Sequence, residues 1–380
     1  MNNKTVQDLY QSLGARPIIN AGGPKTILGG SRISPTVQAA VETANQTYVD
    51  MVELIQASGK IIAHQLEAEA AMVTSGCFGA LALGTAAMMT GSDQENIEQL
   101  PDTTGMKNEF ILQACQRYRY DRALTIFGGN LIEAGQPSGT SVEQLEAAIT
   151  EKTAGMLFVA VGHFAGQLDL EAMLAVAKKH QIPVMIDAAS EVYPLELLTR
   201  YTNMGADLVC FGGKYVGAYN GTGILCGRKD LLDAAFLNSF IGYENAGKVP
   251  LQAVGRPLKL DRQEIVAVVA ALQEWIEMDH EERLAADEAR GMTILQALTD
   301  IPHIQATWMP DERAVLSGVD ITIDEAALGQ TSDQISAALK AGSPSIILER
   351  NQGNVMRANV GQMTNEETAI VADALRKILS

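Results

Sequence analysis

The sequence is poor in cysteine and in basic residues, and each shortage excludes a class of protein. Its 380 residues include 4 cysteines, none in a CxxC pair, so we expect neither a disulfide framework nor a zinc site. The 5 histidines are scattered, so no metal ion is expected. With 28 basic against 45 acidic residues, the formal net charge is −17, which disfavours nucleic acid and anionic membrane surfaces as partners.

Charge is also absent from residues 70–92, a run long enough to cross a bilayer. Glycines interrupt this run, and acidic residues rather than lysines or arginines flank it, which favours a buried helix over a membrane span. The first residues lack the apolar segment of a signal peptide. We therefore expect a cytoplasmic protein without a membrane segment.

From residue 109 to residue 226, short apolar segments alternate with helical patterns. This rhythm predicts βαβ units in a parallel sheet, and the segment Gly223–Cys226 follows its predecessor so closely that we expect it to pair antiparallel. We predict an α/β fold: a mostly parallel sheet in a large domain, to which the family resemblance given below assigns seven strands, and a small C-terminal α+β domain. The expected division is an N-terminal segment covering the site, a large domain and a small domain, at residues 1–45, 46–260 and 261–380.

Two polar residues end neighbouring strands of this predicted sheet. Asp187 closes the apolar segment Pro183–Asp187, and Lys214 follows two glycines after the segment Asp207–Phe211. One βαβ crossover separates them, so both side chains should emerge at the same edge, where α/β proteins bind ligands. Burial there lowers the pKa of a lysine and makes its amine nucleophilic. Taken alone, each residue is also compatible with a plain structural role, Lys214 as a surface lysine and Asp187 as a helix cap.

A third candidate feature is the turn Ser75-Gly76-Cys77, which opens the uncharged helical run. Free N–H groups and the helix dipole at such a turn suit a phosphate group. Tight helix packing explains the same small residues equally well. A lysine, a carboxylate and a phosphate-binding turn together match the needs of pyridoxal phosphate, which forms a Schiff base with a lysine and pairs its ring nitrogen with an acid.

With these residues in this order, the chain resembles the fold-type I pyridoxal-phosphate enzymes, and more narrowly their selenocysteine synthase-like group. Further phrases support the resemblance across residues 17–260, at positions 19–23 (INAGG), 28–31 (LGGS), 73–76 (VTSG), 120–122 (YDR), 131–135 (LIEAG), 186–189 (IDAA), 212–214 (GGK) and 254–259 (VGRPLK). The family usually has Ser-Gly-Gly-Lys, whereas Phe211 takes the place of that serine here.

The resemblance implies a role for each site residue. Lys214 would form the internal aldimine and move the Cα proton, Asp187 would pair with the pyridine nitrogen, and His163 is a further candidate for the catalytic set. The remaining expected cofactor contacts come from residues near the strand ends: Ser75, Gly76, Cys77, Ser190 and, where the family often has a histidine near the ring face, Gln116. Arg357, Arg32 and Asn20 are the candidate substrate-binding residues.

The resemblance also implies a reaction. We expect an ammonia-lyase that removes water and ammonia from a 2-amino-3-hydroxy acid, such as the phosphorylated sugar acid D-glucosaminate 6-phosphate, and leaves a 2-keto-3-deoxy acid. A racemase or epimerase, a selenium or sulfur transferase of the same fold, and a non-catalytic ligand-binding protein remain alternatives. Because fold-type I enzymes build their sites at subunit boundaries, we also expect a homodimer or a higher homo-oligomer.

Overall fold

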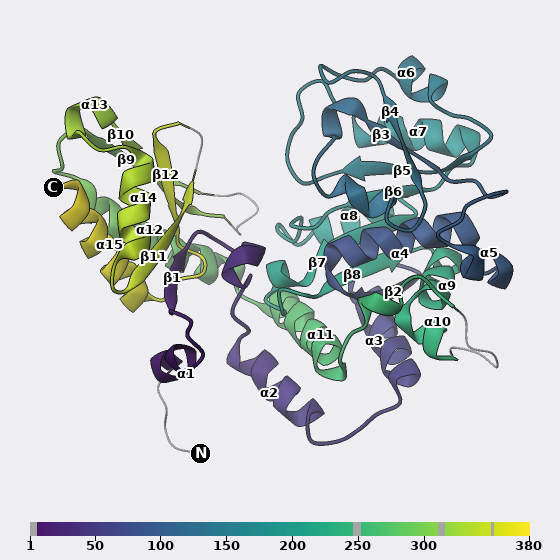
Figure 1. Cartoon of the computed structure of the whole chain (residues 1–380), viewed down its shortest axis with the longest axis horizontal. Helices are drawn as coiled ribbons and strands as arrows, with labels where there is room; N and C mark the ends of the chain where they lie inside the picture. The colour runs from purple at the N-terminus through teal and green to yellow at the C-terminus, as the bar shows by residue number, and fades with distance from the viewer. Residues whose placement is uncertain (1–5, 246–251, 311–315, 351–352) are drawn as a thin grey trace. The chain divides into compact units, whose positions relative to one another are not determined.

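The computed structural model describes residues 6–245, 252–310, 316–350 and 353–380, which form two compact units (Figure 1). The larger unit comprises residues 32–277, and the smaller unit joins residues 1–31 to residues 278–380. The assignment of separate roles to residues 1–45, 46–260 and 261–380 stays a prediction. No helix among the described residues is long and apolar enough to cross a membrane.

The larger unit is built on a seven-stranded sheet in the order β2-β8-β7-β6-β5-β3-β4. The strands from β3 to β7 pair in parallel, and β8 pairs antiparallel with both β7 and β2, as the sequence predicted for residues 223–226. This mostly parallel sheet confirms the predicted fold class. The strands are β2 (Ala70–Thr74), β3 (Glu109–Gln113), β4 (Asn130–Ala134), β5 (Thr153–Val159), β6 (Val184–Asp187), β7 (Leu208–Gly212) and β8 (Gly223–Gly227).

Helix α4 (Gly76–Thr90) packs against β2 and β5–β8, and α9 packs on α4 (Figure 1). Helix α4 carries apolar residues on every face, as expected for a helix that other elements cover on all sides. An added Cβ on Gly84 would lie 2.6 Å from Met185 Sδ, so this glycine lets the helix approach the sheet. The other helices of the unit are α2 (Pro35–Ala44), α3 (Met51–Gln65), α5 (Gln94–Gln99), α6 (Val142–Ala147), α7 (Leu170–His180), α8 (Leu197–Asn203), α9 (Lys229–Asn238), α10 (Phe240–Asn245) and α11 (Arg262–Glu277).

One local prediction was wrong. Residues 70–74 of the uncharged run form strand β2 rather than part of a buried helix, whereas the helix begins at Gly76, in the turn where the sequence placed its start. Apolar residues without periodicity fit a strand covered on both faces as well as a buried helix. The positive φ of 73° at Gly76 separates the two elements.

The smaller unit contains a five-stranded sheet in the order β1-β11-β12-β10-β9. Strand β1, near the N-terminus, pairs in parallel with β11, so the beginning of the chain completes this sheet. Helices α12 and α15 pack together, and α12 also covers β9 and β10, which gives the predicted α+β module. Its elements are α1 (Val6–Ser12), β1 (Ile18–Ala21), α12 (His280–Leu298), β9 (Ile304–Met309), β10 (Gly318–Ile323), α13 (Glu325–Leu328), α14 (Ser332–Ala341), β11 (Ser345–Arg350), β12 (Val355–Asn359) and α15 (Asn365–Leu379).

Candidate active site

Two neighbouring parallel strands bring Asp187 and Lys214 to one edge of the larger sheet. Asp187 is the last residue of β6, and Lys214 lies in the 3-10 turn η4 (Gly213–Val216), directly after β7. Asp187 stands opposite Cys210 in the β6–β7 register, so Lys214 follows only four residues further along the adjacent strand. The carboxyl ends of both strands therefore present a carboxylate and an amine on the same side of the sheet.

The turn between β2 and α4 lies at this same edge. Thr74 of β2 and Gly212 of β7 both stand opposite Gly223 of β8, which places the following residues of both strands close together. An added Cβ on Gly223 would lie 2.4 Å from the carbonyl carbon of Gly76 and 2.6 Å from the nitrogen of Cys77. Strand β8 thus supports the turn through direct backbone contact, which only glycine permits.

Asp187 is buried, with 3% of its surface exposed, and its carboxylate accepts several hydrogen bonds. Oδ1 accepts from the backbone nitrogen of Ala189 at 3.1 Å and from Cys77 Sγ at 3.5 Å, and Oδ2 accepts from the hydroxyl of Tyr118. Burial raises the pKa of Asp187, and these hydrogen bonds oppose that rise without cancelling it. The donors therefore offset part of the cost of keeping a buried carboxylate ionised.

Lys214 is half-buried, and its Nζ lies 5.0 Å from the ring centroid of Tyr215. Burial lowers the pKa of the Lys214 amine, and the charge of Cys77, when ionised, acts in the opposite direction. Burial also raises the pKa of Cys77 well above its usual range, so the thiol is neutral near neutral pH. Lys214 therefore releases its proton at a lower pH than an exposed lysine does, as a nucleophilic amine requires.

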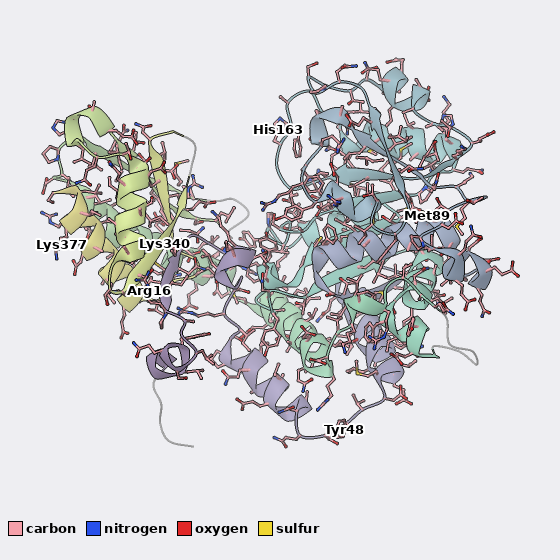
Figure 2. All side chains as sticks on the ribbon, viewed as in Figure 1. Arg16, Tyr48, Met89, His163, Lys340 and Lys377 are labelled. Carbon is pink, nitrogen blue, oxygen red and sulfur yellow. The ribbon has the colours of Figure 1, made fainter. Side chains whose placement is uncertain are left out.

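Three other residues predicted for the site lie in the same unit. Gln116 is fully buried, and its side chain pairs with both backbone groups of Val159, donating to the oxygen at 3.1 Å and accepting from the nitrogen at 3.3 Å. Ser190 is half-buried in the turn after Asp187. His163 lies on an exposed loop that follows β5 (Figure 2). Their roles toward cofactor or catalysis stay predictions.

The predicted substrate-binding residues are divided between the units. Arg32 is exposed and belongs to the larger unit, whereas Asn20 and Arg357 belong to the smaller one. The Asn20 amide closes the turn after β1, donating to Gly23 O and accepting from Gly22 N, both at 3.0 Å. Arg357 forms a two-pronged ion pair with Asp320 at 2.6 and 2.9 Å. The Arg357 guanidinium thus already has a carboxylate partner, and its part in substrate binding stays a prediction.

Sequence reasoning missed Tyr118, whose hydroxyl contacts Asp187. Tyr118 lies in the loop after β3, a parallel strand whose carboxyl end faces the same edge. Its backbone nitrogen donates to Asp121 Oδ2 at 3.2 Å, and Arg117 Nε donates to the same oxygen at 2.6 Å. The available signal was an aromatic residue shortly after a predicted strand, whereas our attention went to Gln116, two residues earlier.

Comparison with known proteins agrees with this arrangement. The model of the aminotransferase class-V family matches residues 102–369. A 5'-C-glycyluridine monooxygenase-decarboxylase from Streptomyces sp is 30% identical, over 97% of this chain and 90% of the relative. D-Glucosaminate-6-phosphate ammonia lyase from Salmonella typhimurium (strain 14028s / SGSC 2262) is 27% identical over 98% of both chains. A solved structure of a D-glucosaminate-6-phosphate ammonia-lyase superposes with a TM-score of 0.85, at 27% identity over 99% of each chain.

Proposed function

Because this chain belongs to the class-V aminotransferase family, we propose that it is a pyridoxal-phosphate-dependent ammonia-lyase acting on a phosphorylated amino sugar acid such as D-glucosaminate 6-phosphate. The full-length similarity to the Salmonella ammonia lyase supports this substrate class. The water eliminated from Cα and Cβ would be taken up again when the enamine hydrolyses, so the net products would be a 2-keto-3-deoxy acid and ammonia. We further propose that the protein works in the cytoplasm as a homodimer or a higher homo-oligomer.

One observation carries the cofactor assignment: the Asp187 carboxylate, the Lys214 amine and the Ser75–Cys77 turn share one edge of the sheet, and Cys77 Sγ donates to Asp187 Oδ1. These groups fit pyridoxal phosphate chemically. Lys214 would hold the aldehyde carbon, Asp187 would accept the N–H of the ring nitrogen, and the first turn of α4 would receive the phosphate. No acidic residue occupies the first turn of α4 to oppose that anion.

Pyridoxal phosphate, when bound, supplies the electron sink that makes the Cα proton of an amino acid removable. The chain's own residues supply the proton transfers. Once its amine is free, Lys214 would take the proton from Cα, since its lowered pKa suits a general base. The resulting ammonium of Lys214 would then donate a proton to the departing hydroxyl at Cβ. Asp187 would stay ionised throughout and hold the ring orientation.

The substrate is expected to carry a carboxylate and a phosphate, whereas the chain as a whole is acidic. Binding therefore requires cationic side chains. We propose Arg32 of the larger unit and Arg357 of the smaller unit as two such cations, and Asn20 as a neutral donor. Arg357 already pairs with Asp320, so it would have to release Asp320 or bind both carboxylates when the substrate arrives. We therefore expect its contribution to substrate affinity to be smaller than that of an arginine without a carboxylate partner.

The first test is an absorbance spectrum of the purified protein with added pyridoxal phosphate. We expect a violet band that Lys214→Ala abolishes and Lys229→Ala preserves, since Lys229 is an exposed residue that pairs with Asp233. The same three proteins are then assayed for ammonia release from D-glucosaminate 6-phosphate. Absence of the band in the wild-type protein would contradict the cofactor assignment.

The relative from Streptomyces, at 30% identity, carries a different activity, so the assay needs a second readout. Hydrogen exchange at Cα, followed by NMR in heavy water, separates elimination from racemisation. Tyr215, whose ring lies beside Lys214 and whose pKa burial raises to about 12, is a neutral acid that a racemase could use as its second proton donor. Exchange without ammonia release would favour that alternative over the lyase.

A further inference from the structure

The hydroxyl of Tyr118 contacts the carboxylate that the proposed function assigns to the ring nitrogen of the cofactor. Tyr118 belongs to neither strand that carries the lysine and the aspartate, and comes instead from the loop after β3. Its phenol is a strong donor, whereas the Cys77 thiol on the other carboxylate oxygen is a weak one at 3.5 Å. Tyr118 is therefore the main side-chain donor to Asp187.

The Asp187 carboxylate has room for one more hydrogen bond from a ligand. A carboxylate has about four acceptor positions, two on each oxygen. Among the residues that the structure describes, Oδ1 of Asp187 receives the Ala189 N–H and the Cys77 thiol, and Oδ2 receives the Tyr118 hydroxyl alone. One position therefore remains open on Oδ2, so a ring N–H can bind there while Tyr118 keeps its own hydrogen bond.

The groups that face Asp187 come from several elements, and none is a cation in direct contact among the described residues. Those that bear on its charge are Tyr118 from the loop after β3, Cys77 from α4, Cys210 from β7 and Tyr215 from η4, while Lys214 acts on Cys77. Burial and the charge of Asp187 raise the pKa of Tyr118 far above its usual value, so the phenol keeps its proton and stays a donor. Hydrogen bonds, rather than an ion pair, must keep this carboxylate ionised.

The loop holds Tyr118 in place before any ligand arrives. Asp121 Oδ2 accepts both the Tyr118 backbone N–H and the Arg117 Nε–H, and a second arginine nitrogen pairs with Glu133. The ring of Tyr118 also packs edge-on against Tyr120, with 5.8 Å between centroids. These contacts fix the direction of the hydroxyl, as a preorganised donor requires.

We propose that Tyr118 is a positioning residue that keeps Asp187 ionised and aimed, so that the carboxylate can accept the protonated ring nitrogen of pyridoxal phosphate. This inference rests on the proposed function, because it concerns the same cofactor site. Without the phenol, the buried carboxylate retains one backbone donor and a weak thiol, and burial raises its pKa further. A protonated Asp187 must release its proton before it can accept a ring N–H, so cofactor binding then weakens as the pH falls.

The test compares Tyr118→Phe with the wild-type protein by titrating each cofactor-free protein with pyridoxal phosphate and following the violet band. We expect the ratio of the variant's dissociation constant to that of the wild type to rise as the pH falls, toward a limit of about tenfold for a rise of one unit in the Asp187 pKa, and to approach one at high pH. Tyr120→Phe is the matched control, since its hydroxyl receives a hydrogen bond from Arg119 and not from the site. We expect the ratio of the dissociation constant of Tyr120→Phe to that of the wild type to stay constant with pH.

A second pair of variants shows whether Tyr118 acts through the carboxylate. In an Asp187→Asn background, Tyr118→Phe should add no pH-dependent change, because residue 187 can no longer ionise. The inference would be overturned if the ratio of the dissociation constants of Tyr118→Phe and the wild type did not change with pH. Tighter cofactor binding by Tyr118→Phe at every pH would also overturn it, because the phenol would then compete with the cofactor ring for Asp187. Failure of the wild-type protein to bind the cofactor would instead overturn the proposed function, and this inference with it.

Discussion

Lys214 is a charged residue in surroundings that oppose its charge. Burial lowers the pKa of its amine, and the amine nitrogen lies 5.0 Å from the ring centroid of Tyr215. Below its folded-state pKa the amine is protonated in both the folded and the unfolded chain, and the folded state then bears the desolvation cost. As the pH rises toward the ordinary pKa of lysine, the folded protein loses its proton first and the cost disappears.

Replacing this lysine by an apolar residue of similar length should therefore stabilise the cofactor-free protein. We expect Lys214→Met to raise the melting temperature by a few degrees at neutral pH, with the gain shrinking as the pH approaches about 10, near the unfolded-state pKa. Differential scanning calorimetry across this pH range measures the effect. Lys229→Met, at an exposed position, is the control and should give no pH-dependent gain. A melting temperature lower than that of the wild type at neutral pH would contradict the prediction.

The same residue scale shows what a sequence can predict of a site. Asp187 and Lys214 could be paired in advance, because both end apolar segments one crossover apart and the rules of parallel sheets place such ends together. Tyr118 could not, because its approach to Asp187 depends on the path of an irregular loop fixed by Asp121. The resemblance assigned Gln116 to the face of the cofactor ring. Its buried hydrogen bonds with the backbone of Val159 could not be predicted from sequence spacing either.

Among the elements, β8 approaches the turn before α4 closely enough to exclude any side chain at the contact. Gly223 leaves no room for a Cβ, because the backbone of Gly76 and Cys77 lies within 2.6 Å of where it would be. A methyl group there must push the strand and the turn apart. The carboxylate, the amine and the turn would then no longer share the spacing that the cofactor needs.

Gly223→Ala should therefore lower the free energy of unfolding by about 1–3 kcal/mol, the usual cost of overpacking. Urea denaturation measures this change, and the cofactor dissociation constant should rise in parallel. Gly221→Ala is the matched control: its Cβ would meet only Glu264 Oε1, at an ordinary contact distance of 3.8 Å. Equal stabilities of the two variants would show that β8 and the turn are not in tight contact.

The elements also show where sequence patterns lose information. The antiparallel pairing of β8 was predicted, because too few residues separate β8 from β7 for a helical crossover. The turn at Ser75–Cys77 marked the start of α4, but strand β2 was missed, because its small apolar residues lack the alternation that distinguishes a strand from a helix. What divides the two elements is a single backbone conformation at Gly76, and hydrophobicity does not encode that conformation.

For the whole molecule, the resemblance to fold-type I enzymes predicts an oligomer, and some exposed apolar residues are compatible with one. Tyr48 is 89% exposed and the adjacent Val49 is 45% exposed, both in the segment between α2 and α3. The Arg262 guanidinium lies over the Tyr48 ring, 4.9 Å from its centroid. Single apolar residues on a surface need no explanation, but two consecutive exposed ones are good candidates for an interface. A second copy of this chain is the partner that the resemblance favours.

We therefore expect size-exclusion chromatography with light scattering to give a multiple of the 40.6 kDa chain mass. If the Tyr48 segment lies in the interface, the double substitution Tyr48→Glu with Val49→Glu should shift the protein toward the monomer, because carboxylates buried in an apolar interface oppose association. Val142→Glu, at an apolar residue of 37% exposure on α6, is the control and should leave the mass unchanged. A monomeric wild-type protein would contradict the oligomer, whereas an unchanged double variant would place the interface elsewhere on the surface.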